Sequence, residues 1–175
     1  MSVRIYKYRC DGDVFDSLSL RSRSGHDDVL NKLLGQPVGQ AWTPLKAKFY
    51  RVGRQGDFPY LAGHVPAFSK RALSALSPLL GDTIEPLPLV TPSGTYSAIH
   101  VLEVIDALDL NRSKVEWLDE DRILDIERYV FKPEAVQGKH IFRIRQHALA
   151  FTYVSEAFRQ AVEESALEGL ALKEV

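Results

Sequence analysis

The sequence predicts an α+β fold, with a mostly antiparallel sheet and two principal helices packed against it. Short segments that alternate apolar and polar residues indicate half-buried strands. Two segments, around residues 69–80 and 155–166, repeat apolar residues at helical spacing. The length of 175 residues, with 45% hydrophobic and 26% charged residues, is typical of one globular domain with its own core. We therefore expect a single domain over residues 1–175.

The first fifty residues are expected to contain strands and a short helix. Residues 3–9 alternate in the manner of a strand, and residues 45–52 do the same. A short helix is expected from Asp28 to Leu34, because an aspartate can cap its start and Gly35 can end it. This region therefore supplies two strands to the predicted sheet.

The first principal helix is expected to run from a cap at Ser69 to Leu80, where Gly81 stops it. Pro78 removes one amide donor from its last turn. The next segment, residues 83–90, is extended but contains two prolines. Proline cannot donate to a strand ladder, so this segment suits a sheet edge or a loop better than a central strand.

The remaining strands and the second principal helix lie in the carboxy-terminal half. Strands are expected at residues 96–105, 126–131 and 140–145. The last stretch, residues 151–175, has the pattern strand, helix, strand. Ser155 can cap its helix, Gly169 ends the connection, and residues 170–175 can close the sheet as an edge strand.

No catalytic or metal-binding motif is visible in the sequence. The histidines have no compact ligand spacing, and we interpret them as exposed or hydrogen-bonded surface residues: His26, His64, His100, His140 and His147. Cys10 is the only cysteine, which excludes an internal disulfide. A thiol beside Arg9 is open to activation, but packing is the commoner role of a lone cysteine. We predict no catalytic residue, no metal and no cofactor.

Charge argues against non-specific binding to nucleic acid or to an anionic membrane, because the net charge is −1. Two local concentrations of charge remain. The first third is basic, through Arg21, Arg23, Lys46, Lys48, Arg51 and Arg54. An acidic run, Asp119–Asp121, is followed by Asp125 and Glu127. Most such runs are solvated surface, and the alternative for the acidic run is a docking patch for a basic partner.

Membrane insertion and secretion are not indicated. The first ten residues contain no apolar core of signal-peptide length, and no later segment is long and apolar enough to span a bilayer. The simplest expectation is a cytoplasmic protein.

Six segments, in this order and spacing, together carry a resemblance to a known family. They are Val65–Leu73, Ile84–Pro88, Tyr96–Asp109 with Ser113, Ile126–Phe131, Ile141–Arg143, and Tyr153–Phe158 with Leu167–Leu170. Together they resemble immunity protein family eleven of bacterial polymorphic-toxin systems. The resemblance covers about residues 57–175, and residues 1–56 are less distinctive.

The resemblance implies a toxin inhibitor that is not an enzyme. Members of such families protect the producing cell by binding a toxin encoded by an adjacent gene. The toxin is secreted or contact-delivered, as in type VI secretion between competing bacteria, and is often a nuclease. The partner expected for this chain is therefore its cognate toxin, with no membrane and no direct nucleic-acid contact. The oligomeric state is left open.

The candidate toxin-binding residues are Trp117, Asp119, Glu120, Asp121 and Asp125. An aromatic anchor beside acidic residues suits a basic nuclease cleft. Trp42, Tyr60 and Tyr129 are further anchor candidates, each with partial burial in the core as the alternative. Two other functions stay open. One is a ligand- or nucleic-acid-binding module that uses the basic first third, and the other is an enzyme with a site assembled from scattered histidines and carboxylates.

Overall fold

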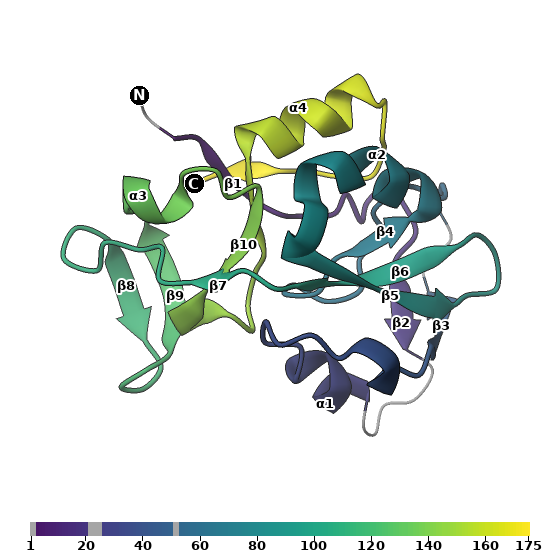
Figure 1. Ribbon diagram of the computed structural model, residues 1–175, viewed down its shortest axis with the longest axis horizontal. Coiled ribbons are helices and arrows are strands. Elements are labelled where there is room, and N and C mark those ends of the chain that lie inside the picture. Colours follow the sequence, from purple (N-terminus) through teal and green to yellow (C-terminus); the bar gives the residue numbers. More distant parts are fainter. Residues whose placement is uncertain (1–2, 21–25, 51–52) are drawn as a thin grey trace.

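The chain folds into two five-stranded sheets, a two-stranded hairpin and four α-helices (Figure 1). These counts apply to residues 3–20, 26–50 and 53–175, which the computed structural model describes. The predicted α+β class and the mostly antiparallel pairing are confirmed. The sequence did not indicate that the strands divide into separate sheets.

The first sheet has the strand order β12-β1-β11-β10-β7. Its members are β1 (Ile5–Lys7), β7 (Val104–Ile105), β10 (Ile141–Ile144), β11 (Tyr153–Ser155) and β12 (Lys173–Glu174). All neighbours pair antiparallel except β10 and β7, which are parallel. The predicted final edge strand is confirmed as β12, which pairs with β1.

The second sheet has the order β2-β3-β5-β6-β4. Its members are β2 (Leu18–Leu20), β3 (Leu45–Phe49), β4 (Ala67–Ser69), β5 (Ile84–Val90) and β6 (Tyr96–Val101). Only β3 and β5 pair in parallel. Alternation predicted β3, and the strongly apolar run 96–105 predicted β6, but that run was expected as one strand and its last two residues form β7 of the first sheet. Three-residue strands such as β2 and β4 are too short to show a period.

Strand β5 corrects the prediction of an edge strand or loop, because it lies between β3 and β6. The reason is the register of its two ladders. β5 pairs with β3 only at Leu89 and Val90, whereas Pro86 and Pro88 pair with β6 alone. The two prolines, which have no amide donor, therefore lie in the part of β5 that is paired on one side only.

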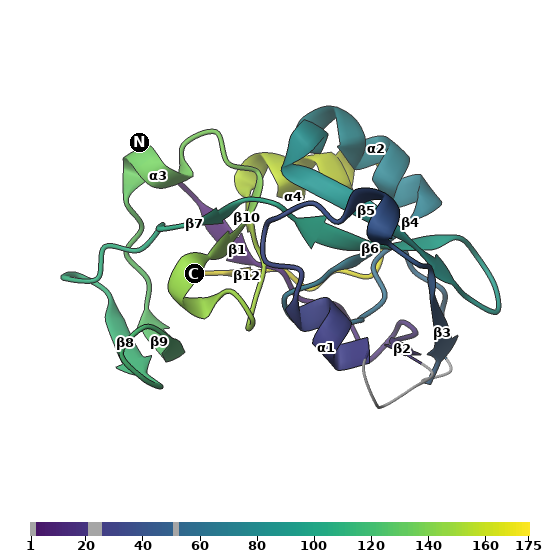
Figure 2. The ribbon, with the colours of Figure 1, turned by 60° about the horizontal axis from the view of Figure 1, so that its bottom comes forward.

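The two principal helices are α2 (Lys70–Leu80) and α4 (Glu156–Glu164), and they lie side by side in Figures 1 and 2. Both predicted caps are confirmed. The Oγ of Ser69 accepts a hydrogen bond from the Ala72 amide at 3.0 Å, and the Oγ of Ser155 accepts one from the Phe158 amide at 3.2 Å. Each cap satisfies a helix-end donor that would otherwise lack a partner.

Two shorter helices complete the set. α1 (His26–Asn31) starts and ends earlier than the predicted Asp28–Leu34 helix. α3 (Pro133–Val136) is a single turn that begins at a proline, and the sequence analysis did not predict it. Within the described residues, no helix combines the length and the apolar character needed to cross a bilayer.

The largest core cluster lies between the two principal helices and both sheets. Phe58 and Phe68 meet edge to face at its centre, with ring centroids 5.2 Å apart. It also contains Leu76 of α2 and Phe158 of α4, both fully buried. Burying a side chain of this size contributes about 1.5–3 kcal/mol, so this cluster holds helices and sheets together.

The hairpin consists of β8 (Lys114–Trp117) and β9 (Ile123–Arg128), at one end of the molecule in Figures 1 and 2. A separate core cluster fastens it to the first sheet. Ile123 and Ile126 of β9 are buried there with Phe142 of β10 and Tyr153 of β11. The hairpin is therefore anchored through one face of β9, while most of β8 remains exposed.

Arg143 ties the first sheet to its neighbours. Its side chain on β10 is fully buried and donates to the backbone carbonyls of Leu33, Val101 (3.3 Å) and Ala148 (3.3 Å). Burial lowers its pKa to about 10. The three acceptors come from the segment after α1, from β6 and from the loop after β10, so one guanidinium joins all three.

Candidate functional site

The β8–β9 hairpin turn is built around Asp119. Its Oδ1 accepts hydrogen bonds from the amides of Asp121 (3.1 Å) and Arg122 (2.9 Å), and its Oδ2 accepts from the Arg122 guanidinium at 2.6 Å. These interactions, the Arg122 side-chain bond first, hold the pKa of Asp119 below its ordinary value. Asp119 is therefore a turn-forming residue as well as a member of the predicted acidic run.

The other predicted acids are exposed on the same hairpin. Glu120 and Asp121 lie in its turn, and Asp125 lies on β9 directly opposite Glu116 of β8. Within the described residues, the carboxylates of these four residues accept no side-chain hydrogen bond and form no ion pair. The hairpin therefore presents uncompensated negative charge to solvent.

Trp117, the predicted aromatic anchor, is 45% exposed and pairs with Ile123 across the hairpin. The structure thus brings all five predicted site residues onto one element. The other aromatic candidates differ. Trp42 donates from its indole nitrogen to the Pro88 carbonyl at 2.9 Å, and Tyr129 is hydrogen-bonded to Tyr153, so both have structural partners.

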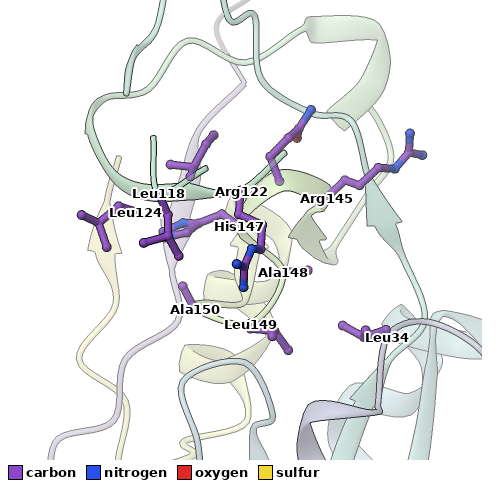
Figure 3. A pocket seen from close by; sticks show the side chains of 11 residues that line it. Leu34, Leu118, Arg122, Leu124, Arg145, His147, Ala148, Leu149 and Ala150 are labelled. Atoms are coloured by element: carbon purple, nitrogen blue, oxygen red, sulfur yellow. The ribbon is translucent and has the colours of Figure 1, made fainter. Parts of the chain in front are cut away.

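An apolar groove of about 340 Å³ lies beside the hairpin turn (Figure 3). Four leucines around it are each about half exposed: Leu34 (47%), Leu118 (55%), Leu124 (51%) and Leu149 (47%). In Figure 3, Leu118 and Leu124 lie on one side and Leu34 on the other. Exposed apolar side chains are ordinary when scattered, but a contiguous group around a hollow is typical of an interaction site.

Polar side chains also reach this groove, at the end of β10 and in the loop that follows it. The Arg145 side chain is exposed and forms no hydrogen bond or ion pair with any described residue. Gln146 donates from its amide nitrogen to Asp106 at 3.1 Å. His147 is only 6% exposed, and burial lowers its pKa below the ordinary value. The groove therefore combines apolar walls with a few polar groups, as binding sites do.

The sequence analysis missed the groove residues because they come from three separate segments. Leu34 follows α1, Leu118 and Leu124 flank the hairpin turn, and Leu149 follows β10. The sequence contained one signal. Leu118 and Leu124 lie on either side of the charged run Asp119–Arg122, and leucine is unusual beside an exposed, charged turn.

The histidines correct one prediction, since several are buried rather than on the surface. Buried among the described residues are His64, His100 and His147. Their isolation in the sequence gave no indication of burial. The side chain of His26 lies outside the described part of the structure. No group of three or more histidine, cysteine, aspartate or glutamate side chains that could hold a metal occurs among the described residues.

His100 has a structural role. Its Nδ1 lies 2.9 Å from a Glu85 carboxylate oxygen, and its Nε2 accepts from the Gly35 amide at 3.0 Å. Glu85 in turn accepts from the amides of Val38 and Gly39. Burial lowers the pKa of His100, so the neutral ring bridges β6 to the loop after α1.

Cys10 is a packing residue. It is partly buried against the largest core cluster, and burial raises the pKa of its thiol to about 12. Since the thiolate is the reactive form, activation by the neighbouring Arg9 is not supported.

The structure describes three of the six residues that make the first third basic. Lys46 and Lys48 are exposed on β3, and Arg54 is paired with Glu168 at 2.9 Å. Arg21, Arg23 and Arg51 lie outside the described residues.

A protein-family model matches the carboxy-terminal half of this chain. The model of the immunity protein family (Imm11) matches residues 90–175, a range that contains β6 to β12, the hairpin and every groove residue except Leu34. No curated protein matches the chain at a significant level. The match supports a general role in toxin immunity and suggests an inhibitor rather than an enzyme. Residues 90–175 of this chain are therefore similar to the immunity protein family (Imm11).

Proposed function

We propose that this protein neutralises a cognate toxin by binding it directly through the β8–β9 hairpin and the adjacent groove. The proposed contact residues are Trp117, Asp119, Glu120, Asp121 and Asp125, together with the leucines of the groove. The family match supports the general role, and the exposed surface of the hairpin and groove supports the proposed location.

The observation that carries the proposal is the half-exposed apolar surface around the groove. Trp117 directly precedes Leu118 of the groove and pairs with Ile123, which also lines it, so an exposed aromatic side chain adjoins this apolar surface. Stable protein interfaces have this arrangement, with a few large anchors at the centre and a polar rim. A standard interface buries about 800 Å² per partner, so the contact would extend beyond the groove.

The charge of the hairpin indicates the chemistry of the partner. Glu116, Glu120, Asp121 and Asp125 are unpaired carboxylates that attract a basic surface. Nucleases carry such surfaces, because they must bind the phosphate backbone. A nuclease toxin whose basic cleft is covered by the hairpin is therefore the form of the proposal that we favour.

Neutralisation of this kind requires no catalysis by the inhibitor. A stoichiometric inhibitor needs only a surface complementary to its target. We propose that it acts in the cytoplasm of the producing cell, on a toxin of a polymorphic system encoded by the adjacent gene.

Co-expression with the toxin of the adjacent gene tests this proposal. The unaltered chain should restore growth and co-purify with the toxin. Trp117→Ala should weaken the affinity by more than about tenfold, the loss expected of a central aromatic anchor. Tyr50→Ala is the matched control, because Tyr50 is an equally exposed aromatic residue (53%) that follows β3. Growth that does not depend on this chain, or equal effects of the two variants, would refute the proposed function.

A further inference from the structure

Segment 34–39, which follows α1, lies between two anchors that do not titrate between pH 7.5 and pH 5. Before its start, Leu33 is buried and its carbonyl accepts from the Arg143 guanidinium. The pKa of Arg143 is about 10, so this anchor stays charged in acid. Beyond its end, the Trp42 indole donates to the Pro88 carbonyl at 2.9 Å. The segment is therefore a loop with two fixed ends.

Between these anchors, backbone amides hold segment 34–39 to His100 and Glu85. The Gly35 amide donates to Nε2 of His100 at 3.0 Å. Glu85 accepts from the amides of Val38 at 3.0 Å and of Gly39 at 2.7 Å. His100 on β6 pairs directly with Glu85 on β5. Among the described residues, no other hydrogen bond joins segment 34–39 to the two sheets.

The Gly35 bond requires a neutral His100 ring. A backbone amide only donates, so Nε2 must offer its lone pair. The single ring proton is then on Nδ1, which lies 2.9 Å from a carboxylate oxygen of Glu85 and donates to it. Protonation of the ring would place a second N–H against the Gly35 amide, so two donors would face each other. One proton is therefore enough to break this bond.

The surroundings of His100 make opening of the segment sensitive to acid. The ring is fully buried, and burial is the main cause of a pKa below the ordinary value of 6.5. Glu85 on β5 favours the charged ring, Arg143 on β10 disfavours it, and segment 34–39 faces it with the Gly35 amide. Because the closed form binds protons less readily than the open form, a fall in pH favours the open form.

We propose that segment 34–39 is a wall of the groove that acid releases through His100. The segment carries Leu34, which lies across the groove from Leu118 and Leu124 (Figure 3). Leu34 lies between the Arg143 anchor and the His100 anchor, so protonation of His100 removes one of its two supports. The groove then loses this wall and keeps the wall formed by the hairpin. This release does not depend on the proposed function.

The ¹⁵N shifts of the His100 ring test the first step, with the unaltered chain and no partner. At pH 7.5 the ring should carry its proton on Nδ1 and leave Nε2 unprotonated. A proton on Nε2 would overturn the inference, because that ring has no acceptor for the Gly35 amide.

Amide exchange between pH 7.5 and pH 5 tests the release itself. After correction for the intrinsic rate, the opening of Gly35, Val38 and Gly39 should increase below about pH 6.5, by at most about tenfold per pH unit, the slope for uptake of one proton. The range stays above 4.5, the ordinary pKa of the Glu85 carboxyl group. Unchanged protection of these amides would overturn the inference. Loss of protection in step with the amides of β10 would also overturn it, because the acid effect would then be global.

His100→Gln separates this ring from the other buried histidines. Glutamine offers a neutral acceptor but takes up no proton, so the opening of segment 34–39 should lose its dependence on pH. His64 and His147 also have a pKa lowered by burial, and a full pH dependence in the variant would assign the effect to them and contradict the proposal. The measurements on the unaltered chain decide the question even where this variant fails to fold.

Glu85→Gln distinguishes proton control from mere support. The substitution keeps an acceptor for Nδ1–H but removes the charge that favours the protonated ring, so the His100 ring should titrate at lower pH. A purely structural Glu85 would weaken protection of the segment at every pH and leave the titration of the ring unchanged. That result would contradict the proposal.

Discussion

Glu156 shows how one residue links a strand to a helix. At the start of α4, its carboxylate accepts hydrogen bonds from the Tyr6 hydroxyl of β1 and from the Arg159 guanidinium at 2.6 Å. The Arg159 bond first, and then the Tyr6 bond, lower the pKa of Glu156 to about 2. Its charge also lies favourably at a helix amino terminus.

We predict that Glu156 makes stability sensitive to acid. The folded pKa of about 2 lies below the ordinary value of 4.5, so the unfolded chain binds more protons between these two pH values. The contribution of Glu156 is complete above about pH 4.5 and is lost as the pH falls through 2.

Denaturant unfolding measured from pH 7 to pH 2 checks this prediction. Glu156→Gln should be less stable at pH 7 and should lose less stability on acidification than the unaltered chain. Glu164→Gln, an exposed change at the other end of α4, is the control. Identical acid profiles for all three proteins would contradict the assigned role.

For single residues, the sequence predicted a role correctly where that role depends on neighbours in the chain. Ser69 and Ser155 were recognised as caps because a cap acts on an amide three residues later. His100 and His147 were not recognised, since their partners and their burial depend on distant elements. Among the predicted site residues, Asp119 has hydrogen-bond partners that are close in sequence. Its position beside an apolar groove, in contrast, depends on segments that are distant in sequence.

The hairpin carries a pair of like charges that disfavours its own formation. Glu116 and Asp125 lie directly opposite each other in the antiparallel β8–β9 ladder. Opposed like charges destabilise a strand pair, whereas the neighbouring Lys114 and Glu127 form an ion pair. An unfavourable pair on an exposed hairpin is consistent with a surface that serves a partner.

We predict that Glu116→Lys stabilises the hairpin and weakens toxin binding. The substitution replaces repulsion with an attractive cross-strand pair, which is worth about 0.2–1 kcal/mol. It also removes one of the acids that attract a basic toxin. Amide exchange of residues 114–128 would report the first effect, and the association rate with the toxin would report the second.

Glu120→Lys is the comparison for this experiment, because Glu120 lies in the turn and has no partner across the ladder. It should slow association without slowing amide exchange. A Glu116→Lys variant that exchanges faster, or that binds the toxin as quickly as the unaltered chain, would contradict the prediction.

At the scale of elements, the sequence pattern predicted strands such as β3 and β10 and both principal helices, and failed where it had no signal. Strand β8 exposes three of its four residues, so no apolar alternation marks it. Strand β5 was predicted at an edge because of its prolines, but the deciding factor was the register with β3. Pairing partners are non-local information that a single sequence does not display.

Across the whole molecule, the groove joins parts of the chain that are distant in sequence. Leu34 precedes the range that matches the family, whereas the hairpin and the loop after β10 lie within it. Arg143 fixes their relative positions, because its buried guanidinium bonds to the carbonyls of Leu33 and Ala148. The adjacent groove residues Leu34 and Leu149 are therefore held by a single buried side chain.

The general architecture was predictable from composition and pattern, but the division into two sheets was not. Both sheets bury residues in the same central cluster, for example Ile99 of β6 and Val154 of β11. This shared core is in keeping with a single domain. The single-domain organisation expected from the sequence stays a prediction.

Hydrogen–deuterium exchange on the complex with the cognate toxin tests the central claim most directly. We predict slower exchange in the complex at residues 115–126 of the hairpin and at residues 147–150 of the groove, with little change in β2 and β3 at the far end of the molecule. Protection confined to β2 and β3, or a toxin that forms no complex with this chain, would contradict the account.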